Sequence, residues 1–206
     1  MSILDKFVRS FLTSNQRRQR AAVQRAKAVL RRFPAAAELI CCEVGVYRGD
    51  MSAAMLARNP RLRLVLVDSW EGEGRAYQTQ NDPKARMSSD QMEGHYRATM
   101  AVVAFATGRV DVRRMRSLEA AASFPEGYFD FVFIDADHSY EGCRDDIAAW
   151  KGKVKPGGWL CGHDYKTKPG RHIGVMRAVD EFCIRHGLTL ETDANSTWFL
   201  RLVPHR

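Results

Sequence analysis

Acidic and imidazole side chains follow directly after two short apolar runs in the second half of the chain. They are Asp135, Asp137 and His138 after residues 129–134, and His163 and Asp164 after residues 159–161. Carboxylates and imidazoles can ligate a divalent cation, and an imidazole can also take up a proton near neutral pH. If the two runs are neighbouring parallel strands, both end at the edge of the sheet where open α/β folds bind ligands. We therefore expect one site at this edge.

The pattern around these side chains predicts the elements that position them. The run 129–134 has the nearly continuous apolar character of a strand buried on both faces of a parallel sheet. From Tyr140 to Trp150 apolar residues recur with helical spacing. Residues 155–158 (Lys-Pro-Gly-Gly) are expected to end that unit, and residues 159–161 to start a new strand.

The same alternation of short apolar runs and helical patterns extends over the remaining chain. Further strands are expected at 38–43, 63–67, 110–115, 188–191 and 197–202. Further helices are expected at 3–33 (one or two, with Ser14 or Asn15 as a cap and Pro34 as the end), from Gly49 to about Arg58, and at 89–107, 118–124 and 173–186. Residues 71–88 form a long polar connection, which is either a substrate-specificity loop or a surface insertion. This order predicts a single α/β domain.

A glycine-containing turn follows the first expected strand, which ends at Glu43. Gly45 and Gly49 give the pattern E-x-G-x-x-x-G, whereas nicotinamide-binding turns read GxGxxG. A carboxylate at Glu43 would repel a pyrophosphate but could receive the ammonium group of an amino-acid ligand. This difference favours S-adenosylmethionine over NAD.

An acid also ends the second expected strand. Asp68 follows Gly45 at about the 20-residue distance at which an acid meets the ribose hydroxyls in doubly wound nucleotide-binding folds. Trp70, two residues later, could line the adenine pocket. A turn acid at Asp68 and a core-packing role for Trp70 are the alternatives.

The net charge of +8 is concentrated at the N-terminus of this 206-residue chain. In residues 1–34 the only acid is Asp5, and the basic residues are Lys6, Arg9, Arg17, Arg18, Arg20, Arg25, Lys27, Arg31 and Arg32. This segment could attract a nucleic acid, an anionic substrate or a membrane surface, or it could be a solvated helix face. We divide the chain into this basic helical segment (1–34), acting as a lid or an oligomer contact, and a domain at 35–206.

The five cysteines show no CxxC spacing, and no apolar run is long enough to span a membrane. The N-terminus also lacks the features of a secretory signal. We expect reduced thiols and a cytoplasmic location.

Three segments together resemble class I S-adenosylmethionine-dependent methyltransferases: EVGVYRGDMSAAM, VDSW, and FDFVFIDADHSYEG with VKPGGWLCGHDY. The chain is most similar to the small metal-dependent O-methyltransferases of the caffeoyl-CoA, catechol and macrocin types. The resemblance implies a Rossmann-like, seven-stranded, mostly parallel sheet with helices on both faces and an antiparallel last strand. It also implies S-adenosyl-L-methionine as the methyl donor and Mg²⁺ or Mn²⁺ as a metal.

The resemblance also implies roles for individual residues. The expected cofactor-binding residues are Glu43, Gly45, Tyr47, Gly49, Ser52, Asp68, Ser69, Trp70, Ser117, Asp135 and Asp137. The expected metal ligands are Asp135, His163 and Asp164, and the expected catalytic residues are His138 and His163. His138 occupies the place of a lysine base in those enzymes. Tyr165 replaces the Asn that completes the caffeoyl-CoA-type metal site, and Asp137 has helix capping as its alternative role.

The function predicted from these observations is methylation of a hydroxyl group on a small molecule by a metal-assisted enzyme, with a homodimer as a reasonable assembly. A nucleic-acid methyltransferase using the basic N-terminal helices is the second interpretation. Against it, the segment GHDYKTKPG contains no Asn/Asp-Pro-Pro-aromatic motif of the kind that holds a flipped base. A non-catalytic protein that only binds the cofactor is the third.

Overall fold

The computed structural model describes residues 13–72, 87–165 and 173–202. The main helices are α2 (Ser14–Leu30), α3 (Asp50–Arg58), α4 (Ser89–Val103), α5 (Ser117–Ala122), α6 (Tyr140–Trp150) and α7 (Ile173–His186). The strands are β1 (Leu39–Val44), β2 (Leu62–Asp68), β3 (Val110–Arg114), β4 (Phe129–Ile134), β5 (Val154–Gly162), β6 (Leu190–Asp193) and β7 (Thr197–Arg201). Strands and helices alternate as the sequence predicts.

The seven strands form one sheet in the order β3-β2-β1-β4-β5-β7-β6. Strands β1 to β5 pair with one another in parallel, and β7 runs antiparallel to both β5 and β6. This confirms the predicted Rossmann-like sheet with an antiparallel last strand. The chain order reverses between β1 and β4, so the ends of these two strands flank the switch point at which such sheets bind ligands.

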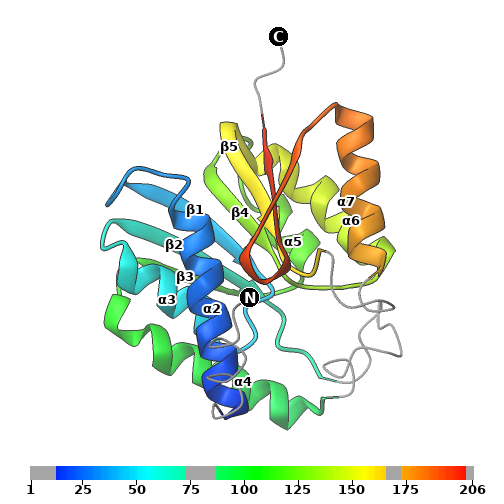
Figure 1. The fold of residues 1–206 in the computed structure, drawn as a ribbon. Coiled ribbons are helices and arrows are strands. Elements are labelled where there is room, and N and C mark those ends of the chain that lie inside the picture. Colours follow the sequence, from blue (N-terminus) through cyan, green and yellow to red (C-terminus); the bar gives the residue numbers. More distant parts are fainter. Residues whose placement is uncertain (1–12, 73–86, 166–172, 203–206) are drawn as a thin grey trace, which may run out of the picture.

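Helices cover both faces of the sheet, giving three layers (Figure 1). Alternate residues of a strand enter opposite hydrophobic cores: Phe131 and Phe133 pack with α2, α3 and α4, whereas Val132 and Ile134 pack with α5, α6 and α7. All four side chains are nearly or fully buried. Burial on both faces explains why the run at 129–134 is almost continuously apolar.

Strand β5 begins earlier than expected, at Val154, because the Pro-Gly-Gly segment belongs to the strand and does not end it. Val154 already pairs with Phe129, and the register shifts between Phe129 and Phe131. Gly158 makes this irregular pairing possible, since a Cβ there would lie 2.7 Å from the carbonyl oxygen of Asp130. The predicted turn at this position is therefore wrong.

The N-terminal helix α2 packs into the same core as the sheet. Its cap is Thr13, whose side chain accepts from the backbone N–H of Gln16, and not the predicted Ser14 or Asn15. The helix ends at Leu30, so Pro34 lies beyond it. This helix and the sheet share one hydrophobic core, because four residues of α2 are buried in the cluster that contains Phe131 and Phe133. They are Ala22, Ala26, Ala28 and Val29. The role of residues 1–34 as a lid or an oligomer contact stays a prediction.

The predicted helix before residue 13 and most of the polar connection at 71–88 lie outside the described residues, as does the segment 166–172. Among the described residues, no helix combines the length and the apolar character needed to cross a membrane.

Candidate active site at the carboxyl edge of the sheet

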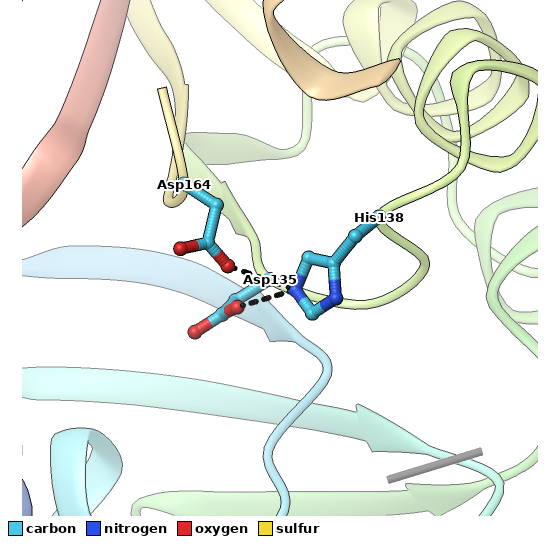
Figure 2. Close-up of side chains that lie close together, drawn as sticks. All are labelled: Asp135, His138 and Asp164. Atoms are coloured by element: carbon cyan, nitrogen blue, oxygen red, sulfur yellow. Dashed lines mark hydrogen bonds and ion pairs between the residues drawn. The ribbon is translucent and has the colours of Figure 1, made fainter. Parts of the chain in front are cut away.

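Two aspartates and a histidine converge at the carboxyl ends of β4 and β5 (Figure 2). His138 Nε2 lies 3.0 Å from Asp164 Oδ2 and 3.4 Å from Asp135 Oδ1. The three side chains are mostly buried, with exposed side-chain fractions of 7%, 13% and 15% for His138, Asp164 and Asp135. The sequence prediction of one site formed by both strand ends agrees with this geometry.

His163 flanks the same two carboxylates. Its Nδ1 lies 3.3 Å from Asp164 Oδ1 and 3.6 Å from Asp135 Oδ1. Burial lowers the pKa of His163, but the charge of Asp135 and hydrogen bonds with both aspartates outweigh burial and raise it to about 9. Burial raises the pKa of Asp164, yet hydrogen bonds from His138 and His163 hold it well below its usual range. Two imidazoles thus compensate the negative charge of the carboxylate pair.

The backbone around these residues is fixed by the sheet. The N–H of Asp135 donates to Val44 O at 2.8 Å, and the N–H of His163 donates to Ile134 O at 3.0 Å. Asp164 follows with φ 63°, in the left-handed region that non-glycine residues rarely adopt. Such conformations cost energy and concentrate at functional sites, because the surrounding structure must hold them.

The next residue, Tyr165, anchors this strained turn to the neighbouring elements. Its backbone N–H donates to Ser196 O, and its hydroxyl donates to Asp180 on α7 at 2.7 Å. Tyr165 therefore acts as a structural anchor in the place where the caffeoyl-CoA-type enzymes carry an Asn ligand.

The chemistry of the donor set fits a divalent cation. Asp135, His138 and Asp164 each offer one ligand atom, and these atoms all lie within 4.8 Å of one another. Two carboxylates with one imidazole suit Mg²⁺ or Mn²⁺. Within the described parts of the chain this group includes His138 and leaves out His163, which was the predicted third ligand.

The glycine turn after β1 lies against the end of β4. Gly45 has φ 89°, and a Cβ on it would lie 2.1 Å from the carbonyl oxygen of Asp135. Gly49, with φ 73°, caps the start of α3. The close approach that Gly45 allows is therefore between two strand ends, and it brings the turn beside Asp135.

Asp68 joins the turns that follow β1 and β2. Its Oδ2 accepts from the N–H of Tyr47 at 2.9 Å, and its Oδ1 accepts from the N–H of Trp70 at 2.8 Å. The indole of Trp70 donates to the carbonyl of Tyr47 at 2.9 Å, and Trp70 is 1% exposed. Tyr47 and Trp70 both have positive φ, at 58° and 43°. This burial places Trp70 under the turn, as the core-packing alternative expects.

Glu43 is buried where β1 ends. Its carboxylate accepts from Ser52 Oγ at 2.6 Å, and the two residues are 3% and 0% exposed. Burial raises the pKa of Glu43 to about 8, the hydrogen bond from Ser52 and the charge of Arg25 oppose the rise, and Asp135 and Asp68 add to it. A buried acid with so high a pKa marks a candidate site for a cationic ligand group.

The other predicted cofactor residues make local contacts. Ser117 Oγ bonds to Asp146 and accepts from the Trp150 indole, which links α5 to α6. Asp137 accepts from the N–H of Ser139, the cap of α6, at 2.7 Å. Asp137 therefore does not cap α6 itself but holds the backbone of Ser139, which is the cap.

Comparison with known proteins identifies the family. A family profile described as a methyltransferase domain matches residues 42–165, more than half of the chain. The chain belongs to this methyltransferase family. No curated protein sequence matches it significantly.

Solved structures, NovP and other methyltransferases among them, share the fold of this methyltransferase at low sequence identity. The O-methyltransferase NovP has a TM-score of 0.61 and 17% identity, over 91% of this chain and 80% of NovP. Cofactor-bound Rv0187 from MTB has a TM-score of 0.57 and 17% identity, over 95% and 83% of the two chains. The 1,6-didemethyltoxoflavin-N1-methyltransferase of Burkholderia thailandensis has a TM-score of 0.57 and 12% identity, over 89% and 79%. The protein is a class I S-adenosylmethionine-dependent methyltransferase that resembles O-methyltransferases.

The methyltransferase site contains one charged residue that the sequence analysis did not single out. Arg25 of α2 affects the pKa of both Glu43 and His163. In the sequence Arg25 is one of many basic residues in residues 1–34. Its position beside Ala22 and Ala26, on the buried side of an amphipathic helix, was the available signal.

Helix α4 also contributes contacts that no motif predicts. Thr99 Oγ1 donates to the carbonyl of Tyr47, and the ring of His95 lies 4.4 Å from the ring of Tyr47. These contacts support the turn after β1 from outside the sheet.

Proposed function

We propose that this methyltransferase transfers a methyl group to a hydroxyl of a small molecule with the help of a divalent cation held at Asp135, His138 and Asp164. The observation that carries the proposal is the convergence of two carboxylates and an imidazole beside the turn after β1 (Figure 2). A donor bound by that turn would present its methyl group next to these side chains.

The donor contacts proposed here follow the ends of β1, β2 and β4. Glu43 would receive the ammonium group of the donor, and Asp68 would accept from the ribose hydroxyls with lone pairs that its two backbone contacts leave open. Gly45 and Gly49 shape the turn between them. Ser117 and Ser69 remain proposed contacts on the adenine side.

Methyl transfer from a sulfonium is an in-line displacement. The acceptor oxygen forms a bond to the methyl carbon, the bond from carbon to sulfur breaks, and the sulfonium becomes a neutral thioether. Alignment of the two reactants lowers the barrier by roughly 7–11 kcal/mol in well-oriented systems. The fixed strand ends that carry Asp135 and Asp164 are suited to this positioning role.

The acceptor hydroxyl must also lose its proton. A cation at the three ligands would supply positive charge that favours the deprotonated hydroxyl. Because His138 Nε2 lies nearer to both aspartates than His163 Nδ1 does, His138 is proposed as the metal ligand. A pKa of about 9 keeps His163 protonated near neutral pH, so His163 is proposed to balance the charge of the two aspartates, and the proton of the acceptor is proposed to pass to solvent water. This assignment gives His138 the ligand role that the resemblance gave His163.

The contacts of α2 favour a small acceptor over a nucleic acid. Arg18 pairs with Asp50, and Arg31 and Arg32 both pair with Asp193. Arginines that are engaged by carboxylates on the same chain are less available to neutralise phosphates. Among the structural neighbours, the Burkholderia thailandensis enzyme holds 1,6-didemethyltoxoflavin together with S-adenosylhomocysteine.

Chelation and metal replacement test this proposal. Transfer of labelled methyl from S-adenosylmethionine to a library of sugars, phenols and other small hydroxyl compounds should be abolished by a chelator and restored by Mg²⁺ or Mn²⁺. Direct Mn²⁺ binding, measured by electron paramagnetic resonance, should be lost in Asp164→Asn and retained in Asp145→Asn, a partly exposed aspartate on α6. Full turnover after exhaustive metal removal would refute the metal-assisted mechanism.

A further inference from the structure

Two side-chain hydrogen bonds hold helix α2 in place beside the active site. Arg18 Nε donates to Asp50 Oδ2 at the start of α3, with 2.5 Å between the atoms. Further along the helix, Asn195 in the turn between β6 and β7 donates to Gln24 Oε1. The helix therefore crosses the front of the sheet in a fixed position (Figure 1).

Arg25 directly follows the second of these attachments, and within the described residues no carboxylate pairs with it. Its neighbours Ala22 and Ala26 are both 0% exposed. The Nε of Arg25 is buried without a hydrogen-bond partner, and within the described residues its side chain forms no ion pair. Arg25 as a whole residue is half-buried. Burying its Nε without a partner is costly, because this atom has lost hydration and gained no hydrogen bond in return. The arrangement is that expected of a residue waiting for an anionic ligand group.

The attachments of α2 locate Arg25 near the carboxyl edge of the sheet. Asp50, the partner of Arg18, directly follows the glycine turn after β1, and Asn195, the partner of Gln24, precedes Ser196, whose carbonyl accepts from the N–H of Tyr165. Burial raises the pKa of Glu43 to about 8, and the positive charge of Arg25 acts against that rise. The two side chains are therefore close enough to interact, yet no ion pair joins them within the described parts of the chain. A guanidinium and a carboxyl group that lie in one region without an ion pair can receive the carboxylate and the ammonium of a zwitterion, and the carboxyl group releases its proton as the ammonium binds.

We propose that Arg25 binds the carboxylate of the amino-acid end of the methyl donor, opposite Glu43, which receives its ammonium group. The planar guanidinium offers parallel N–H donors that match a carboxylate in geometry and charge. Residues of the strand ends would recognise the nucleoside, and α2, which precedes the matched domain at 42–165, would complete the amino-acid subsite. The inference rests on the donor and is independent of the proposed metal and acceptor.

A carboxylate on the acceptor substrate is the other anionic group that Arg25 could bind. The proximity of Glu43 favours the donor, since the ammonium and carboxylate of an α-amino acid are separated by one carbon atom. Ligands that differ only in the donor's carboxylate distinguish these sources.

The test compares two ligands by calorimetry on the full-length protein. S-adenosylhomocysteine carries both the ammonium and the carboxylate, whereas S-adenosyl-3-thiopropylamine keeps the ammonium and lacks the carboxylate. The wild-type protein should prefer S-adenosylhomocysteine by about tenfold or more, as expected for one charged, bidentate contact. Arg25→Gln should abolish this preference, and Arg25→Lys should retain part of it. Lys27→Gln, an exposed change on the same helix, should leave the preference unchanged.

The free energy of unfolding without ligand separates binding from folding. Arg25→Gln should leave it little changed, because within the described residues Arg25 forms no ion pair that the variant would break. An unchanged preference in Arg25→Gln, or equal losses for both ligands, would overturn the proposal and leave Arg25 to the acceptor or to the fold. A wild-type protein that binds neither ligand would instead contradict the donor itself.

Discussion

Replacing Glu43 by Gln should stabilise the ligand-free protein at alkaline pH and at the same time weaken donor binding. Glu43 is 3% exposed and accepts from Ser52 Oγ, and burial raises its pKa from 4.5 to about 8. In the unfolded chain the carboxyl loses its proton near pH 4.5, whereas in the folded protein it keeps the proton until about pH 8. The unfolded state therefore binds fewer protons in this interval, and stability falls as the pH rises through it.

The size of the effect follows from the size of the pKa shift. One pKa unit corresponds to 1.36 kcal/mol. The ionisation of Glu43 therefore lowers the free energy of unfolding by about 1 kcal/mol at pH 5 and by about 5 kcal/mol at pH 8.5. Gln has nearly the same shape, can still accept from Ser52, and carries no charge at any pH. The stability of Glu43→Gln relative to wild type should therefore rise by about 4 kcal/mol between pH 5 and pH 8.5.

Urea unfolding followed by tryptophan fluorescence at pH 5, 7 and 8.5 measures this difference. The matched control is Glu38→Gln, because the Glu38 side chain precedes the same strand and is 79% exposed. The control should show no comparable pH dependence. A Glu43→Gln effect of equal size at pH 5 and pH 8.5 would refute the assignment of a protonated Glu43 in the ligand-free protein.

The affinity for S-adenosylhomocysteine should change in the opposite direction. A neutral amide gives the ligand's ammonium group no counter-charge, so Glu43→Gln should weaken binding by about tenfold or more even where it stabilises the fold. In the wild-type protein the ammonium should lower the pKa of Glu43 and expel its proton. Calorimetry near pH 7 in buffers of different ionisation enthalpy should therefore detect proton release on binding.

Three further variants test the remaining geometry. Gly45→Ala should lower the free energy of unfolding by about 3 kcal/mol or more in thermal unfolding, since the added Cβ would collide with Asp135 O. Gly108→Ala is the control: at φ 88° with open space around it, this change should lower the free energy of unfolding by only about 1 kcal/mol. Asp68→Ala should lower stability by about 2 kcal/mol and weaken S-adenosylhomocysteine binding, because two backbone N–H groups lose their charged acceptor. His138→Ala should weaken Mn²⁺ binding by about tenfold or more with little change in donor affinity; unchanged Mn²⁺ binding would remove His138 from the ligand set.

The elements that sequence reasoning predicted best are those whose burial is most uniform. The strand at 129–134 and the helix from Tyr140 were both predicted with their observed starting residues. Burial on both faces forces an unbroken apolar run, and the change to helical spacing marks the next element. Strand β5 was shortened in the prediction because Pro156-Gly157-Gly158 has the local composition of a turn. This segment is a strand because it pairs with β4 and β7, and that pairing cannot be recognised from the residues of the segment alone.

The same distinction applies to the site. Asp135, His138, His163 and Asp164 could be predicted to meet, because residues that follow adjacent parallel strands share one edge. Both imidazoles approach the two carboxylates, and side-chain direction after each turn decides which one lies nearer. His138 Nε2 is 3.0 and 3.4 Å from the carboxylates, and His163 Nδ1 is 3.3 and 3.6 Å away.

The sequence by itself determined the alternation of strands and helices and the strand ends that carry the chemistry, and its resemblance to a known family implied the seven-stranded sheet. Local patterns suffice for the alternation and the strand ends, because burial on one or two faces dictates the spacing of apolar residues. Only the tertiary structure decided that Trp70 is buried beneath the turn after β1, and that Arg25 of the basic N-terminal helix lies near enough to Glu43 for its charge to act on the pKa of that carboxyl group. Both results depend on how segments distant in the chain pack together. The packing of α2 against the sheet decides whether Arg25 is a surface charge or part of a binding site, and the local sequence does not determine that packing.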